Sequence, residues 1–532
     1  MQKQLYRPAK ISLALGFTAV FFAFSHTWLL NIIALPLGLT TILMGFIAAW
    51  LIQRRRQSVR GIGVALGSVF AGIFGVIASV MVMANMATNQ FDPRRRQHEH
   101  LQRAMGSSSM PDNSATNFTS NLPIIVLHTD GQYISKEDQS IARAEFFGVV
   151  PGTHRAALSS NPEYQGLLGI HMRGSSTMDL PKHSFTVHML DSKTNQTKVA
   201  LLGMPKEEDW VLYAPFEDKT MIRDVLAFQL ANKMGRYAPR TRYVELFMSS
   251  SRRPVSMRDY AGVYVLMEKI KRSPNRVNIA RLSSEDRSEP EISGGYIIKR
   301  DHRERPEMHF RTSRGGPYFY VYPNAKQINS EQKAWLKNYL NSFEEALYGE
   351  DFKDPKTGYA AYLDVDYFID EHWLIELSKN VDGFRYSSFI TKDRGGKIQT
   401  GPPWDWNRSF GNANYYGGES TRGWYSSRLR DNEISYFQRL QEDPGFMKRR
   451  AKRWRELRKD VLDLKKIHTA IDELAAQLEE AQARNFKRWP ILGEHLSCNY
   501  FVGETYEEEV RWLKKWIADR IAWIDGQVGI VE

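Results

Sequence analysis

The chain has 532 residues, which exceeds one ordinary domain and predicts two or three folded units. Its formal net charge is +12, and the positive charges gather beside apolar N-terminal segments and in the C-terminal segments, which is typical of a membrane-adjacent protein. No zinc-finger spacing or nucleic-acid module occurs, so no nucleic-acid partner is expected. The single cysteine, Cys498, excludes an intramolecular disulfide and a multi-cysteine metal site.

Three apolar segments open the chain, over 11–29, 30–52 and 61–84. Each has the roughly 20 residues that cross a hydrocarbon core, so we expect a membrane region over 1–88 with three transmembrane helices. A buried soluble hairpin is the alternative. Lys and Arg flank the first two spans, and the positive-inside rule then predicts an integral protein of the bacterial inner membrane whose C-terminal domain is extracytoplasmic. Only Arg94-Arg95-Arg96 indicates the opposite orientation.

The rest of the chain changes from strand patterns to helix patterns. Polar residues over 89–121 predict a flexible linker. Short apolar and alternating runs predict a β-rich lead-in over 122–165 and further strands within a domain over 166–430. A C-terminal helical region is expected over 431–532. Helical periodicity is found at 220–234, 332–348, 364–378, 446–463, 466–489 and 507–524. The expected fold class of the folded part is α+β.

The loop over 401–411 is the strongest candidate for chemistry. Asp405 stands between Trp404 and Trp406, and Asn407 follows in a turn rich in Gly and Pro. Large rings limit mobility and water access, which suits a carboxylate that holds Mg²⁺ together with phosphate oxygens. Asp382 lies upstream, before an extended run, and two Asp around a hairpin-like segment are similar to the base and metal carboxylates of protein kinases. The alternative is that Asp405 merely caps a turn.

A second group of candidates precedes this loop. The turn over 171–177 exposes backbone amides that can approach phosphates, and Lys182 on the next strand can neutralise them; alternatively, Lys182 is an exposed strand lysine. Glu268 ends an apolar strand, and a buried carboxylate needs a partner, which Lys182 or Arg173 can supply. A surface position is equally compatible with Glu268.

Two further charged motifs have open interpretations. Arg223 begins a helix, where it can meet phosphate or the Asp405 loop, or join a structural salt bridge. The segment Arg300-Asp301-His302-Arg303 follows a strand, and its charges either line a cleft or belong to a solvated loop.

Seven motifs occur in a definite order, from about 165 to 425. They are Met172-Arg173-Gly174-Ser175-Ser176, Pro181-Lys182-His183-Ser184-Phe185, Asp209-Trp210-Val211-Leu212, Met221-Ile222-Arg223-Asp224, Gly262-Val263-Tyr264-Val265-Leu266-Met267-Glu268, Asn380-Val381-Asp382 and Pro403-Trp404-Asp405-Trp406-Asn407. In this order they resemble the spore coat protein H (CotH) kinase family. The resemblance implies an atypical protein-kinase-like domain that binds ATP and Mg²⁺ and phosphorylates Ser or Thr of protein partners.

The resemblance also implies residue roles. Lys182 would touch the ATP phosphates, Glu268 would anchor Lys182, Asp382 would be the catalytic residue, and Asp405 with Asn407 would hold the metal. The expected nucleotide-binding residues are Arg173, Ser175, Ser176, Lys182, Arg223 and Glu268. Two positions depart from the pattern: the family usually has a second Asp where Asn407 stands, and Ser387 occupies the place of a metal-binding Asn in kinases.

These departures leave the function open between classes. The first hypothesis is a membrane-anchored kinase that acts in cell-envelope or surface assembly. Because ATP is scarce outside the cytoplasm, a binding or adhesion protein with the same fold and weak or no turnover is a second hypothesis. A modifier of an envelope polymer is the third.

Overall fold

The computed structural model describes residues 110–529, apart from 175–176, 252, 302–308, 315, 430–435 and 497, together with short helical pieces between 39 and 77. The chain divides into two compact units, Met1–Leu101 and Gln102–Glu532, and each is considered by itself. The predicted linker over 89–121 runs across this division. Its residues 89–109 lie outside the described part, whereas Met110 and Ala115 are buried in a small apolar cluster.

The predicted membrane region is corrected by the structure. The span expected over 11–29 lies outside the described residues, and the other two are described only in helical pieces within 39–50 and 69–77. Crossing a bilayer takes about 20 consecutive apolar residues. Among the residues that the structure describes, no helix is long and apolar enough for this. The predictions of three transmembrane helices and of an integral membrane protein are therefore wrong for the described chain.

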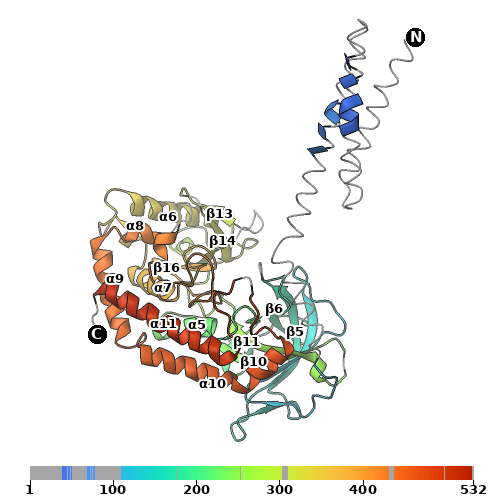
Figure 1. The fold of residues 1–532 in the computed structure, drawn as a ribbon. Coiled ribbons are helices and arrows are strands. Elements are labelled where there is room, and N and C mark those ends of the chain that lie inside the picture. Colours follow the sequence, from blue (N-terminus) through green and yellow to red (C-terminus); the bar gives the residue numbers. More distant parts are fainter. Residues whose placement is uncertain are drawn as a thin grey trace, which may run out of the picture. The chain divides into compact units, whose positions relative to one another are not determined.

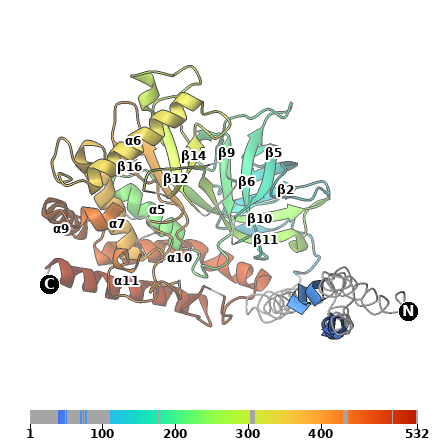
Figure 2. The same cartoon turned by 90° about the horizontal axis from the view of Figure 1, so that it is seen from above.

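The first part of Gln102–Glu532 is a closed barrel, shown in cyan to green in Figures 1 and 2. Its strands are β2 (Ile124–His128), β3 (Ser140–Phe147), β5 (Tyr164–Arg173), β6 (Ser184–Leu190), β9 (Asp209–Tyr213), β10 (Thr241–Ser249) and β11 (Tyr260–Glu268). They follow one another around the barrel as β10-β11-β9-β6-β5-β3-β2, and parallel pairing of β2 with β10 closes it. The barrel thus combines strands from the predicted lead-in and from the domain after residue 166.

Apolar side chains that alternate along these strands fill the barrel. Leu168 and Ile170 of β5, Val187 and Met189 of β6 and Leu212 of β9 are all almost fully buried. Side chains two residues apart on a strand share a face, so each strand contributes one row to this core. Two small two-stranded sheets lie outside the barrel: β1 (Thr119–Ser120) pairs with β4 (Ala156–Ala157), and β7 (Val199–Leu201) forms a hairpin with β8 (Met204–Glu207).

A second sheet is associated with the helices. Its strands, in spatial order, are β13 (His309–Arg311), β14 (Pro317–Tyr322), β12 (Tyr296–Arg300), β15 (Ser388–Lys392) and β16 (Ile398–Thr400). The helices before and around it are α5 (Arg223–Lys233), α6 (Ser330–Tyr348) and α7 (Val365–Ser378). Helix α6 begins with a reciprocal cap between Asn329 and Gln332, and Asp364 caps α7, which explains why these helices start close to the predicted positions.

Four helices complete the chain: α8 (Tyr436–Leu440), α9 (Pro444–Arg458), α10 (Leu464–Arg488) and α11 (Tyr506–Val528). The two long helices α10 and α11 lie side by side in both ribbon views (Figures 1 and 2), and α10 packs on barrel strand β11. Gly262 permits this approach, because a Cβ there would meet Asn485 Oδ1 at 2.7 Å. The C-terminal helices therefore support the barrel directly. The described part of the chain is a mixed α/β fold built on a seven-stranded barrel.

Candidate active site

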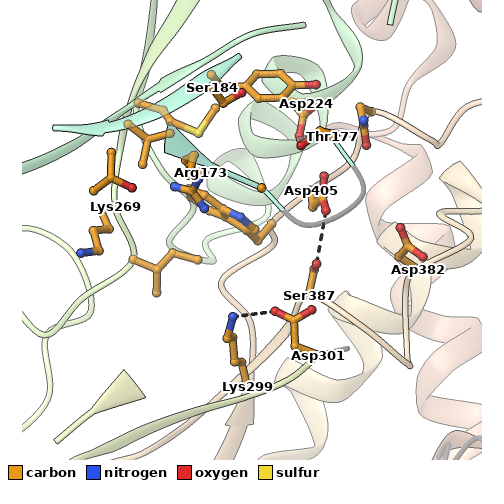
Figure 3. Close-up of a pocket in the computed structure, with 18 of the residues that line it drawn as sticks. Arg173, Thr177, Ser184, Asp224, Lys269, Lys299, Asp301, Asp382, Ser387 and Asp405 are labelled. Carbon is orange, nitrogen blue, oxygen red and sulfur yellow. Dashed lines mark hydrogen bonds and ion pairs between the residues drawn. The ribbon is translucent and has the colours of Figure 1, made fainter. Parts of the chain in front are cut away.

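A cavity of about 450 Å³ is lined by both the barrel and the second sheet. The barrel contributes residues from β5, β6, β9 and β11, and α5 contributes Asp224. The opposite wall comes from β14 and β15 and from the loops that carry Asp382 and Asp405. Figure 3 shows the two loops facing the barrel strands across this space. Two loops that lie apart in the sequence thus share one cavity.

The wall formed by these loops has a definite order of elements. Helix α7 ends at Ser378, the loop with Asp382 follows, the hairpin of β15 and β16 comes next, and the Asp405 loop closes the sequence. The two loops are tied together, because Phe410 N donates to Ser378 O at 2.6 Å and Asn380 Nδ2 donates to the backbone oxygen of Asp405 at 3.4 Å. A catalytic Asp and a metal-binding Asp occur in this order in protein kinases.

The backbone holds Asp405 in an uncommon conformation. Its φ is +66°, and Ser387, whose Oγ donates to Asp405 Oδ2 at 3.3 Å, has a φ of +49°. Non-glycine residues seldom adopt positive φ, and such strain persists only where the surroundings impose it, often at functional sites. The loops therefore present the Asp405 carboxylate in one fixed direction.

Two aspartates of the cavity, Asp224 and Asp405, have raised pKa values, although basic side chains also line it. Burial raises the pKa of Asp405 to about 6, and the nearby Asp382 adds to this, although Arg408 and Arg173 act in the opposite direction. Burial together with the charge of Asp405 raises the pKa of Asp224 to about 8. Carboxylates that repel one another at such a position favour a bound cation. The carboxylates of Asp224 and Asp405, which come from different elements, thus suit a bound cation.

Asp382 also lines the cavity, and its side chain is half-buried. Two hydrogen bonds stabilise its loop, because Arg385 Nη2 and Tyr425 Oη both donate to the backbone oxygen of Val381 at 2.6 Å. Asn380 Oδ1 accepts a hydrogen bond from the Asp382 amide at 3.2 Å. The structure therefore brings together Asp382 and Asp405, as the sequence predicted for one site.

Arg173 supplies positive charge opposite these carboxylates. It stands at the end of β5, is half-buried, and its guanidinium lies 5.0 Å from the centre of the Trp404 ring. Stacking on an aromatic ring orients the guanidinium without neutralising it. Lys269 and Lys299 also line the cavity, and Lys299 pairs with Asp301 at 2.5 Å. The segment over 300–303 therefore contributes Asp301 to the cavity, while His302 and Arg303 lie outside the described residues.

Lys182 lies away from the cavity that contains Arg173. Its side chain is 2% exposed, and its Nζ donates to Val263 O at 2.6 Å and to Asn485 Oδ1 of α10 at 2.9 Å. Burial lowers the pKa of Lys182 well below its usual range. In this structure the lysine joins the barrel to α10 and does not line the cavity, and its contact with a nucleotide stays a prediction.

Glu268 is also buried, but its partners differ from the expected one. Its carboxylate accepts from Arg240 at 2.7 Å and from Tyr237 at 3.1 Å, and Arg276 lies 3.6 Å away. The expected pair of Lys182 with Glu268 is therefore corrected: both are buried, but each has other partners. The physical reason is that the segment before β10, with Tyr237 and Arg240, and the loop after β11, with Arg276, supply the partners of this carboxylate.

The remaining predicted residues fall into two groups. Asn407 lines the cavity, and its Nδ2 donates to Glu217 Oε2 at 3.4 Å. Arg223 is fully buried away from the cavity; it pairs with Asp218 at 2.5 Å and donates to Ser409 O at 3.1 Å, so that it anchors the end of the Asp405 loop. Ser175 and Ser176 lie outside the described residues, whereas their neighbours Gly174 and Thr177 line the cavity.

Asp224 is the cavity residue that sequence reasoning left without a role. It follows Arg223 directly, in the motif whose arginine was chosen as the candidate. Successive helix residues project about 100° apart, so only one of the two can face the cavity. Asp224 faces the cavity, as Figure 3 shows, whereas Arg223 is fully buried and does not line it. The polar pair at a helix start was the available signal, but its orientation depends on how α5 packs.

Comparison with known protein families bears on the class of this fold. The family model for CotH kinase protein matches residues 170–524, which is more than half of the chain. The chain belongs to the CotH kinase family. No curated protein matches the chain.

Proposed function

We propose that the protein transfers the γ-phosphoryl group of ATP to the hydroxyl of a Ser or Thr in a protein partner. The observation that carries this proposal is the meeting of Asp382 and Asp405 in one cavity, opposite Arg173. Phosphoryl transfer needs little covalent chemistry from a protein. It depends on positioning and on stabilisation of charge.

The residues of the cavity fit Mg²⁺. Asp405 offers a carboxylate and Asn407 a side-chain carbonyl oxygen, which are hard oxygen donors. Among the described residues, no group of three or more His, Cys, Asp or Glu is arranged to hold a metal by itself, so phosphate oxygens would complete the coordination. When bound, Mg²⁺ supplies charge neutralisation at the β- and γ-phosphates.

The chain's own residues account for the other requirements. Met172, Val211, Ile270, Val321 and Phe389 form an apolar part of the cavity, which is suited to a planar base. Arg173 would bind phosphate oxygens through its fork of N–H donors. Asp382 would orient the acceptor hydroxyl and accept its proton late, as the new O–P bond forms and the bond from the γ-phosphorus to the bridging oxygen breaks, releasing ADP.

The experiment is transfer of radiolabelled phosphate from ATP to a mixture of candidate proteins by the purified full chain with MgCl₂. We expect labelled phosphoserine or phosphothreonine with the wild type, and a loss of at least about 10²-fold with Asp382→Asn, which cannot accept the proton. Absence of transfer by wild-type protein that binds Mg·ATP would overturn the catalytic proposal. Label on a carbohydrate or other polymer instead would overturn the acceptor class.

Binding without turnover is the second candidate function. Three observations favour it. Asn407 is neutral and donates a hydrogen bond to Glu217, and Ser387, which stands where kinases have a metal-binding Asn, donates to Asp405. Lys182 is buried and hydrogen-bonded to Asn485. A protein of this kind would bind Mg·ATP, measured by calorimetry, yet transfer no phosphate under the same conditions. The two measurements together separate the candidates.

A further inference from the structure

Asp224 is a buried carboxylate that does not serve its own helix. It lies in the first turn of α5 and is 4% exposed. The start of α5 is satisfied by another residue, because Asp218 Oδ2 accepts from the amide of Arg223 at 2.9 Å. The side chain of Asp224 is directed instead toward Asp405, as Figure 3 shows. A helix-capping role therefore does not explain this aspartate.

Only one of its two carboxylate oxygens accepts a hydrogen bond of normal geometry, although the hydroxyl of Tyr213, which also lines the cavity, acts on this carboxylate as well. Oδ1 accepts from the amide of Trp406 at 2.7 Å, which places the carboxylate beside the residue that follows Asp405. Oδ2 is buried and has no hydrogen-bond partner in the described part of the chain. No Lys or Arg within the described ranges forms an ion pair with Asp224. Buried charges are normally paired or bound to a metal, so this oxygen lacks a partner of positive charge.

A cation that pairs with Asp224 Oδ2 can lie in the cavity next to Asp405. Asp405 lies across from Asp224, and Asn407 is the next polar side chain of the same loop. Asp405 alone would give a cation a single carboxylate, since Asn407 is neutral. Hard divalent cations such as Mg²⁺ are usually bound by one or two carboxylates together with phosphate oxygens. Asp224 supplies the second carboxylate from a different element.

We propose that Asp224 Oδ2, together with Asp405, directly binds the divalent cation that accompanies the nucleotide. This inference deepens the proposed function and rests on it for the identity of the cation. It assigns to α5 a chemical role besides its structural one: the helix delivers a metal ligand to the Asp405 loop, and the hydrogen bond from Trp406 fixes that ligand in position.

The test uses Mn²⁺ as a spectroscopic probe for Mg²⁺. Binding of Mn²⁺ to the purified full chain is measured by electron paramagnetic resonance, with and without adenylyl imidodiphosphate. We expect Asp224→Asn to weaken Mn²⁺ binding by at least 10-fold. The variant keeps an acceptor for the Trp406 amide and nearly the same shape. The matched control is Asp301→Asn, which removes a carboxylate from the same cavity that is already paired with Lys299; its Mn²⁺ affinity should stay within about twofold of the wild type.

Thermal unfolding separates a ligand from a structural residue. Mn²⁺ should raise the Tm of the wild type and raise that of Asp224→Asn much less, because a cation that binds only the folded state stabilises it. Without metal, the Tm of Asp224→Asn should equal or exceed that of the wild type, since the substitution removes repulsion between two carboxylates. A metal-free variant that is clearly less stable, with a normal response to Mn²⁺, would show a structural role and overturn the inference.

The outcomes for the inference and for the proposed function are distinct. Equal Mn²⁺ affinity of Asp224→Asn and wild type would overturn the role of Asp224 while leaving phosphoryl transfer intact. An equal loss of Mn²⁺ affinity in Asp224→Asn and Asp301→Asn would also overturn it, because the loss would then come from the lower negative charge of the cavity as a whole. Mn²⁺ binding that depends on Asp224, in a protein without phosphoryl transfer, would support the inference and remove the catalytic proposal.

Discussion

The two walls of the cavity, one formed by the barrel and one by the loops with Asp382 and Asp405, differ in whether the predicted kinase residues reach the cavity. The wall with Asp382 and Asp405 keeps both carboxylates in the cavity, on loops that flank a hairpin. The barrel wall departs from expectation, because Lys182 and Glu268 are buried in separate clusters. A motif residue at the right place in the sequence can therefore have a purely structural position in the fold.

This difference shows where positive charge for a nucleotide would come from. In protein kinases the lysine for the phosphates lies on a strand of the β-rich lobe and pairs with a glutamate of a helix. Here helix α5 presents Asp224 to the cavity, and Arg173 at the end of β5 is a cation beside Asp405, together with Arg408 of the Asp405 loop. The barrel wall thus offers an arginine stacked on Trp404 in place of the lysine pair.

Substitution of Asp405 tests the carboxylate wall and should have the largest effect. We expect Asp405→Ala to lower phosphoryl transfer by about 10³-fold or more, because charge stabilisation through a bound metal contributes several kcal/mol to the transition state. The domain should remain folded, since the substitution removes a buried carboxylate whose pKa is already raised to about 6. Turnover and circular dichroism of the same preparation check both points. Near-normal turnover would exclude Asp405 from the site.

Substitution of Glu268 tests whether the barrel wall is structural. Glu268→Ala leaves Arg276 buried without its carboxylate, so we expect a loss of about 3–5 kcal/mol in the free energy of unfolding. Denaturant unfolding measures this loss. The milder Glu268→Gln keeps an acceptor for Tyr237 and should unfold at lower denaturant than the wild type while it binds ATP normally. Normal stability with lost ATP affinity would instead place Glu268 at the nucleotide.

A pair of matched variants compares Arg173, which lines the cavity, with Lys182, which is buried in the barrel away from it. We expect Arg173→Met to weaken ATP binding and turnover together by about 10²-fold, because a bidentate contact to phosphate contributes on the order of 2–3 kcal/mol. Lys182→Met should keep the KM for ATP within about twofold per folded molecule and lose about 1–3 kcal/mol of stability through its broken hydrogen bonds. Lost ATP binding in Lys182→Met, with normal ATP binding in Arg173→Met, would instead place the lysine at the nucleotide.

The smallest expected effect concerns a second cavity of about 220 Å³ behind the Asp405 loop, lined by Glu371 and Pro402. Burial raises the pKa of Glu371 to about 8, above its ordinary value of 4.5. The folded state therefore binds a proton that the unfolded state releases between pH 4.5 and 8, and stability must fall as pH rises through this window.

We expect Glu371→Gln to remove this fall and to be more stable than the wild type at pH 8 by about 1 kcal/mol, since the half-buried carboxyl keeps part of its hydration. Thermal unfolding from pH 5 to pH 9 provides the measurement. Parallel pH profiles for the two proteins would show that Glu371 is ionised in the folded state throughout.

Local sequence patterns were sufficient for the helices and for the carboxylate wall. Helix α6 was expected over 332–348 and is observed at Ser330–Tyr348, because its periodicity and its cap are encoded within a few residues. Asp382 and Asp405 are expected in one site because they flank a hairpin-like segment, and the structure has the antiparallel pair of β15 and β16 between them. Contacts of this kind depend little on the rest of the molecule.

Partners that are distant in sequence could not be found in this way. Lys182 meets Asn485 across 303 residues, and closure of the barrel pairs β2 with β10. The three predicted membrane spans were inferred from apolar composition, and no described helix bears them out. The direction of Asp224 likewise depends on the packing of α5 against the Asp405 loop. Burial, ion pairing and the facing of side chains are properties of the packed chain, and they determined which charged residues reach the cavity.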